Sequence, residues 1–451
     1  MRSLKRFLIA MLVNLPTDIF TYPDVKLPRV WRVTQRHEAP SLSVEQIQAK
    51  TEAAAMALLR ERALPAGAEI AVGVGSRGLD NLVIVVRTVV AALLKAGYNP
   101  FIIPAMGSHG GATAEGQASL LSDYQITEAN VGCSIRATME VEQVGVLEGA
   151  DAGPYAGFPV YCDRNAFGAD AIILINRIKA HTDFSGVLES GIGKMAAIGL
   201  GKRFGAEAIH RYGAAGLADL LPRVARFQAA HLPLLGGVVL LENPEGHTCE
   251  VHPLTVSHVG REPEVALLER ARLLAPSLPF RELDVLIIDE MGKNISGTGM
   301  DTHVIGRLQM PSLDESQWDG PKVRLIAVLD LTDESHGNAS SVGLADLTTE
   351  RLVSRTDFTA TLINARTSGE GGVLRARLPL VLPDAEACIR TAIATCGRND
   401  ASEVRLARIR NTARTTVLEV SEALLQEARA NPSLSLDESS HEIDCSQRLI
   451  F

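Results

Sequence analysis

Short apolar runs alternate with segments of helical periodicity through much of this 451-residue chain. Residues 69–74 and 100–104 have the composition of buried strands, and residues 80–95 between them are apolar at helical spacing. A further helix is expected after Thr113, whose hydroxyl suits an N-cap. The run 169–176 is apolar almost throughout, as in a strand buried on both faces of a parallel sheet. This order of strands and helices predicts a parallel sheet covered by helices.

The same pattern restarts after a proline-containing stretch at residues 276–279. Strands are expected at 284–288 and 323–329. We therefore predict two α/β domains, residues 1–280 and 281–451, each with a mostly parallel sheet covered by helices. The active site is expected in the cleft between the two domains.

Charge and composition exclude two classes of protein. The net charge is −9 and aromatic residues make up only 4%, so the basic surface and stacking side chains of a nucleic-acid binder are lacking. No apolar run reaches the roughly 18 residues of a membrane-spanning helix. Residues 1–16 have the charge and length of a signal peptide, but no small-residue cleavage site follows. With six cysteines and no C-x-x-C pair, we expect a cytoplasmic protein that binds neither nucleic acid nor membrane.

Two glycine-rich stretches have the spacing of nucleotide-binding motifs but lack their other residues. Residues 73–78 have G-x-G-x-x-G spacing without the acidic residue that would hold a ribose about 20 positions on. Residues 191–194 end in Gly-Lys but lack the first glycine and the Ser or Thr of a P-loop. Lys194 nevertheless lies among small residues. The small neighbours predict room for a bulky group attached to the lysine. The alternative explanation of these small residues is close packing of helices.

The ends of the predicted strands carry polar side chains, at the edge where open α/β sheets bind ligands. Ser76 and Arg77 follow the first strand. A glycine-rich loop follows the second strand, and the helix N-terminus after it suits an anion such as phosphate. Its candidate cofactor-binding residues are Gly107, Ser108, Gly110, Gly111 and Thr113.

Three histidines of the first half of the chain are candidate site residues. His109 lies in the glycine-rich loop, His181 follows the strand at 169–176, and His210 comes sixteen residues after Lys194. A single histidine is more often structural, whereas several at strand ends favour function. Because histidine titrates near neutrality and ligates nickel or zinc, these residues predict an acid–base or metal site.

Two polar loops follow strands of the second half, at residues 297–307 and 333–339. Both are expected to face a cleft between the halves, although ordinary turns have the same composition.

Together these motifs resemble those of the nickel-dependent lactate racemase family. The family's Gly-Thr-His loop corresponds to residues 107–109, its histidine before a Phe-Ser-Gly segment to His181, and its Ser-Gly-x-x-Lys lysine to Lys194. The family's nickel-binding histidine, at the same separation from the lysine, corresponds to His210. The loop with Arg77 matches the family's Asp-x-Thr-Arg loop in place. The resemblance extends over nearly the whole chain and is strongest to a branch of lactate racemase-domain proteins.

The resemblance implies a cofactor and a reaction. The cofactor is a nickel pincer nucleotide, of the pyridinium-3,5-dithiocarboxylic acid mononucleotide type, joined to Lys194 through a thioamide, with His210 as the protein ligand to nickel. The pyridinium would accept a hydride from the α-carbon of a 2-hydroxy acid, while His109 and His181 exchange the hydroxyl proton. Return of the hydride to the other face inverts the centre, so the resemblance implies an isomerase, with the cofactor-biosynthesis enzymes as partners.

The substrate is expected to be a 2-hydroxy acid other than lactate. The family's arginine after the loop histidine is Gly110 here, and three extra residues follow His181 before the lysine. The expected substrate-binding residues are Arg77, Lys293 and Arg307. Two alternatives stay open: the same cofactor used for a net redox or lyase reaction, and a nickel- or cofactor-binding protein without turnover.

Overall fold

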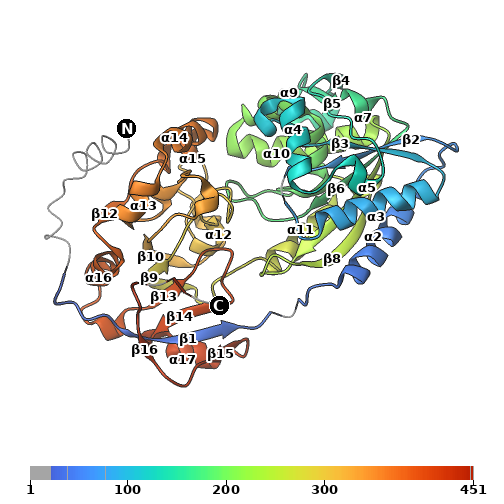
Figure 1. Cartoon of the computed structure of the whole chain (residues 1–451). Coiled ribbons are helices and arrows are strands. Elements are labelled where there is room, and N and C mark those ends of the chain that lie inside the picture. Colours follow the sequence, from blue (N-terminus) through green and yellow to red (C-terminus); the bar gives the residue numbers. More distant parts are fainter. Residues whose placement is uncertain (1–21, 38, 77, 447, 450–451) are drawn as a thin grey trace. The chain divides into compact units, whose positions relative to one another are not determined.

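The structure is a computed structural model that describes residues 22–37, 39–76, 78–446 and 448–449 (Figure 1). The chain divides into two compact units. One comprises residues 39–275, and the other combines the described residues before 39 with those from 276 onward. The signal-like residues 1–16 and the predicted site residue Arg77 lie outside the described residues.

The unit of residues 39–275 contains seven strands and ten α-helices among its described residues. Its strands are β2 (Glu69–Val74), β3 (Asn99–Pro104), β4 (Val141–Val146), β5 (Pro159–Asp163), β6 (Ala171–Arg177), β7 (Leu234–Glu242) and β8 (Thr248–Thr255). Its helices are α2 (Val44–Leu59), α3 (Leu82–Lys95), α4 (Ala114–Asp123), α5 (Glu128–Val131), α6 (Gly149–Ala152), α7 (Arg164–Phe167), α8 (Gly191–Lys194), α9 (Lys202–His210), α10 (Gly213–His231) and α11 (Glu262–Leu273). A π-helical segment, Met195–Leu200, joins α8 to the turn before α9.

The main sheet of this unit has the strand order β3-β2-β6-β7-β8. The first four strands are parallel and β8 is antiparallel to β7. From β2 the chain goes to β3 on one side and later to β6 on the other, so the direction of winding reverses between β2 and β6. Open α/β sheets bind ligands at such a reversal, beyond the carboxyl ends of the strands.

Alternating side chains of the strands build two apolar layers. Ile173 and Ile175 of β6 pack with the buried faces of α2 and α3, which lie side by side on the sheet (Figure 1). Ile172 and Leu174 pack on the other face, in the layer that includes α10 and α11. Because β6 is covered on both faces, its apolar run has no alternation.

The second unit is built on one mixed sheet. Its strand order is β12-β11-β10-β9-β13-β14-β1-β15, with β16 paired to β1. The strands are β1 (Arg29–Gln35), β9 (Glu282–Ile288), β10 (Lys322–Val328), β11 (Leu347–Thr349), β12 (Leu380–Leu382), β13 (Leu406–Ile409), β14 (Val417–Ser421), β15 (Leu434–Leu436) and β16 (His441–Glu442). The helices are α12 (Thr302–Ile305), α13 (Glu350–Arg355), α14 (Phe358–Thr367), α15 (Gly369–Leu374), α16 (Ala385–Thr395) and α17 (Leu425–Ala430). Strands β9 to β13 are parallel, and β14, β1 and β15 add an antiparallel part.

The predicted α/β fold class, with mostly parallel sheets covered by helices, is confirmed. The change of unit at Pro276 falls close to the predicted boundary at 280. The predicted first domain, residues 1–280, differs from the structure at β1, because this strand pairs with β14 of the second unit, Val33 opposite Leu418. The proposed cleft site between the two domains stays a prediction.

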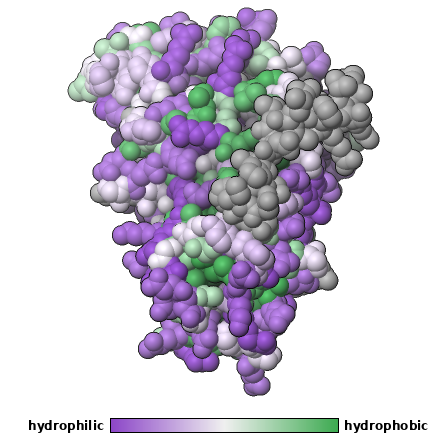
Figure 2. Space-filling model, turned by 90° about the vertical axis from the view of Figure 1, so that its left-hand side faces the viewer, coloured by the Kyte–Doolittle hydropathy of each residue, from purple (hydrophilic) through white to green (hydrophobic). Residues whose placement is uncertain are grey.

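The surface of the described residues carries scattered hydrophobic side chains. Among the described residues no helix is both long and apolar enough to cross a membrane. Figure 2 shows hydrophobic surface in separate groups with hydrophilic side chains between them. Leu362 and Ile363 of α14 and Val373 of α15 are more than half exposed.

Candidate functional site

Three segments with predicted site residues lie at the carboxyl edge of the β3-β2-β6 sheet. Ser76 follows β2, the loop of residues 107–113 follows β3, and His181 follows β6. Because these strands are parallel, all three segments emerge at the same edge, beside the reversal between β2 and β6. The structure therefore brings together segments that are about 100 residues apart in the sequence.

The loop of residues 107–113 owes several of its glycines to close packing. Gly107 has a φ of +60° and donates its N–H to the Gly199 carbonyl over 3.1 Å. Gly110 has a φ of +65°, and a Cβ there would lie 2.7 Å from the Gln117 backbone nitrogen. Both positions therefore require glycine for structural reasons, apart from any ligand.

Of the remaining predicted cofactor residues of this loop, one caps a helix and two have open surroundings. Thr113 caps α4, its Oγ1 accepting the Gly116 N–H over 3.0 Å. Ser108 is exposed, and a Cβ at Gly111 would meet nothing within 4 Å. Ser108 and Gly111 are thus the positions of this set whose surroundings leave space for a ligand.

His109 is held by a hydrogen bond between its Nδ1 and the Ser76 Oγ. The Tyr124 hydroxyl donates to the Ser76 carbonyl over 2.8 Å. The Gln117 Nε2 donates to the carbonyls of Gly107 and His109, over 2.9 and 3.2 Å. Predicted residues from two different loops, Ser76 and His109, are therefore in direct contact, and Gln117 fixes the backbone that carries the histidine.

A buried ion pair lies beneath this loop. The Lys202 Nζ is 2.9 Å from the Asp163 Oδ2, and both side chains are completely buried. The same Nζ donates to the Gln117 Oε1 over 3.0 Å. Burial lowers the pKa of Lys202, and the Asp163 carboxylate opposes that shift. Sequence reasoning missed this pair because lysine is normally a surface residue, and only the fold brings Asp163 of β5 beside it.

The segment with His181 is fixed by Glu189, whose side chain is completely buried. The Glu189 Oε2 accepts the backbone N–H of His181 over 2.7 Å, and its Oε1 pairs with Arg272. The Nδ1 of His181 accepts the Asp183 N–H over 3.1 Å. A neutral His181 ring therefore carries its proton on Nε2.

Lys194 and His181 share an aromatic neighbour. The His181 ring lies 4.5 Å from the Phe184 ring, centroid to centroid. The Lys194 Nζ lies 5.3 Å from the same ring centroid and donates to the Glu189 carbonyl over 3.0 Å. The predicted cofactor lysine and one predicted base thus pack against the same aromatic ring.

His210, at the end of α9, has the hydrogen bonding of a metal-binding histidine. Its Nδ1 donates to the Ala206 carbonyl over 2.6 Å, which leaves Nε2 without the proton in the neutral ring. The surrounding protein lowers the pKa of His210 by desolvation, the Ala206 carbonyl opposes this, and the positive charge of Lys194 lowers it further. A neutral imidazole is the form that ligates metals.

The small residues around Lys194 do not leave the space that the sequence suggested. A Cβ at Gly191 would lie 2.7 Å from the Glu264 Oε1, and a Cβ at Gly193 would lie 2.7 Å from the Leu188 Cδ1. The prediction of room beside the lysine is therefore wrong at these two positions. Close packing is the physical reason for both glycines.

Glu264 is a buried carboxyl group that sequence reasoning also missed. Its Oε1 accepts the Gly193 N–H over 2.8 Å and its Oε2 accepts the Gly260 N–H over 2.9 Å. Burial raises its pKa from 4.5 to about 7, and the backbone N–H groups oppose that rise. A glutamate in the first turn of a helix is typical of a solvated side chain, so only the tertiary contact reveals its role.

Replacing Glu264 with glutamine is expected to remove a pH dependence of stability. Because its pKa is higher in the native state, the native protein binds more protons than the unfolded chain between pH 4.5 and about 7. The free energy of unfolding therefore falls as the pH rises through this window, by roughly 3 kcal/mol for this group. Urea unfolding of wild type and Glu264→Gln from pH 5 to 8 measures the difference.

The control is Glu262→Gln, an exposed glutamate of the same helix turn. It should keep the wild-type dependence on pH. An unchanged slope in Glu264→Gln would contradict the shifted pKa.

The two predicted substrate residues of the second unit lie at opposite edges of its sheet. The Lys293 N–H donates to the Ser335 Oγ over 2.9 Å, which joins the loops after β9 and β10 at their carboxyl ends. Arg307 lies at the other edge, where it donates to the Asp346 Oδ2 over 2.7 Å and to the Val323 carbonyl at the start of β10. Its side chain is 17% exposed. The structure therefore gives Arg307 a stabilising role in the sheet, away from Lys293.

Comparisons with known proteins add little to this site. No protein-family profile matches the chain, and no curated protein matches its sequence. Among solved structures, the chain is similar to a Thermotoga maritima protein determined by the Northeast Structural Genomics Consortium, at 12% identity and a TM-score of 0.49. That similarity covers 84% of this chain and 99% of the other. Among the described residues, no group of three or more His, Cys, Asp or Glu side chains could hold a metal ion.

Proposed function

We propose that this chain is a cytoplasmic isomerase, a racemase or epimerase of a 2-hydroxy acid that carries a nickel pincer nucleotide on Lys194. The proposal starts from the resemblance of its motifs to the lactate racemase family. The observation that carries it further is that Lys194 is near enough to His210 for its charge to contribute to lowering the pKa of the histidine. These are the two residues that the cofactor needs, one for attachment and one for the metal.

The residues present fit the cofactor in their donor chemistry. The Lys194 amine would hold the nucleotide and the His210 Nε2 would ligate nickel, with Nδ1 already turned to the Ala206 carbonyl. When bound, the nucleotide would supply the acceptor for a hydride from the substrate. One protein ligand to nickel is enough in this scheme, so no cluster of several metal-binding side chains is required.

The two remaining histidines would move the substrate's hydroxyl proton. The His181 Nδ1 accepts the Asp183 N–H, so Nε2 would be the ring nitrogen that exchanges the substrate's hydroxyl proton. His109, held by Ser76, would accept the proton on the other side of the substrate. Lys293 and Arg77 are kept as proposed contacts of the substrate carboxylate, and Arg307 is not, because its guanidinium is engaged with Asp346.

Replacing His210 with alanine is expected to lower the nickel content of the protein by about tenfold or more, because the metal loses its protein ligand. The protein is to be produced together with the enzymes that make the cofactor, and nickel is to be measured by mass spectrometry of the metal. His231→Ala is a matched control, since His231 also ends a helix and donates its Nδ1 proton to a carbonyl four residues earlier. Full nickel content in His210→Ala would show that another group is the ligand.

A further inference from the structure

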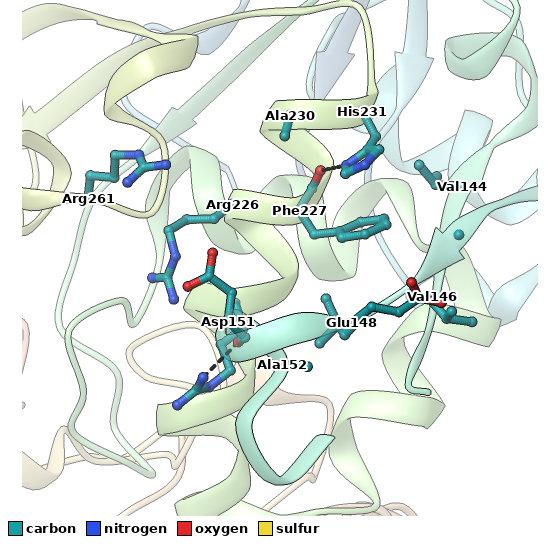
Figure 3. A pocket seen from close by; sticks show the side chains of 13 residues that line it. Val144, Val146, Glu148, Asp151, Ala152, Arg226, Phe227, Ala230, His231 and Arg261 are labelled. Carbon is teal, nitrogen blue, oxygen red and sulfur yellow. Dashed lines mark hydrogen bonds between the residues drawn. The ribbon is translucent and has the colours of Figure 1, made fainter. Parts of the chain in front are cut away.

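A cavity of about 600 Å³ lies between the β4–β5 ribbon and α10 (Figure 3). Its volume is typical of a site for a small organic molecule. Its lining includes Glu148, Asp151, Arg226, Phe227, His231 and Arg261. None of the residues of the proposed racemase site belongs to this lining, so the cavity is a separate feature of residues 39–275.

Two of the three arginines in the cavity have no carboxylate partner in the described part of the chain. Arg223 is neutralised by Asp219, whose Oδ1 lies 2.9 Å from its Nη2. Arg226 is half-buried and donates to a neutral group, the Gly260 carbonyl, over 3.2 Å. Arg261 is exposed and makes no side-chain hydrogen bond or ion pair among the described residues. Both guanidinium groups can therefore pair with an anion in the cavity.

The opposite part of the cavity carries two aromatic rings. The Phe227 and His231 rings are stacked, with centroids 4.0 Å apart and planes at 18°. The His231 Nδ1 donates to the Phe227 carbonyl, which fixes the imidazole against the phenyl ring. Figure 3 shows Arg226 and Arg261 on one side of the cavity and Phe227 and Val144 on the other. A ring of a ligand can therefore stack on this wall while its charged group reaches the arginines.

Two acidic side chains limit what the cavity accepts. Glu148 and Asp151 are both exposed, and neither carboxylate has an ion pair in the described part of the chain. They would repel a second anionic group on the ligand. A ligand with one compact anionic group and an uncharged body therefore suits the cavity best.

We propose that this cavity binds a small aromatic anion, with its phosphate or carboxylate on Arg226 and Arg261 and its ring on the Phe227–His231 pair. Guanidinium groups recognise both head groups in the same two-pronged way. The aromatic part follows from the Phe227–His231 ring pair, and the single charge follows from the acidic side chains. This site is independent of the cofactor chemistry proposed above.

Titration calorimetry of the full chain with phenyl phosphate, benzoate and inorganic phosphate tests the proposal. We expect saturable one-to-one binding of phenyl phosphate or benzoate, and the stronger of the two identifies the head group. Inorganic phosphate should bind about tenfold more weakly than phenyl phosphate because it lacks the ring. No saturable binding of either aromatic anion, or equal binding of inorganic phosphate, would overturn the proposal.

Charge variants locate the bound anion. Arg226→Gln and Arg261→Gln should each weaken binding about tenfold, whereas Arg87→Gln, an exposed arginine of α3, should leave it unchanged. Arg261→Gln is the safer variant for folding, because this side chain is exposed. Glu148→Gln should tighten binding, since it removes a repelling charge. Equal loss in Arg87→Gln, or weaker binding in Glu148→Gln, would show that the anion binds elsewhere or in another way.

Discussion

Lys194→Arg is expected to abolish covalent attachment of the cofactor and with it all isomerase activity. Arginine keeps the positive charge and can keep the contacts with the Glu189 carbonyl and the Phe184 ring. It has no primary amine, so the bond to the nucleotide cannot form. The substitution therefore separates the chemical role of the lysine from its structural one, and the fold should be unaffected.

Peptide mapping by mass spectrometry, on protein made together with the cofactor enzymes, measures this effect. The wild-type peptide with Lys194 should carry a nucleotide-sized increase in mass, and the variant should carry none. Lys179→Arg is the matched control, a half-buried lysine of the same loop region that should leave the adduct in place. The proposal would be contradicted if Lys194 were unmodified in wild type, or if the adduct were lost in Lys179→Arg and kept in Lys194→Arg.

The fold could be predicted where apolar runs are short and separated by turn residues. The predicted strands at 69–74 and 100–104 became β2 and β3 almost to the residue. The β4–β5 ribbon was not predicted, because β4 is only half-buried and has no apolar run. The place of β1 could not be predicted either, since it depends on pairing with β14 across most of the chain. Long-range pairing leaves no local signal in a strand.

The positions of the site residues at the sheet edge could be predicted from the sequence, but the buried groups that support them could not. Parallel strands put Ser76 and His109 at one edge, and the structure confirms that they meet. The roles of Glu264 and Lys202 depend on burial and on distant partners, which a single sequence does not show. The single sequence also could not show that Gly191 packs against the Glu264 side chain. The predicted space for a ligand at this glycine was wrong for that reason.

His109→Ala and His181→Ala are each expected to lower isomerase turnover by about 10²- to 10⁴-fold in both directions. Inversion of the α-carbon needs a proton acceptor on one side of the substrate and a donor on the other, and each direction uses the pair in opposite roles. The hydrogen bond from the Asp183 N–H orients the His181 ring, and Ser76 orients the His109 ring. Loss of either histidine should therefore affect both directions alike.

Turnover of a panel of 2-hydroxy acids by wild type and the two variants checks this expectation, with the Lys194 adduct and nickel content measured in parallel. Both should persist, because neither His109 nor His181 holds the cofactor in this scheme. His258→Ala, at an exposed histidine near the start of α11, should keep full turnover. Ser76→Ala should cost less than His109→Ala, since the serine only orients the ring. Near-normal turnover in either histidine variant would remove that histidine from the reaction, and loss in one direction alone would show that the two do not act as a pair.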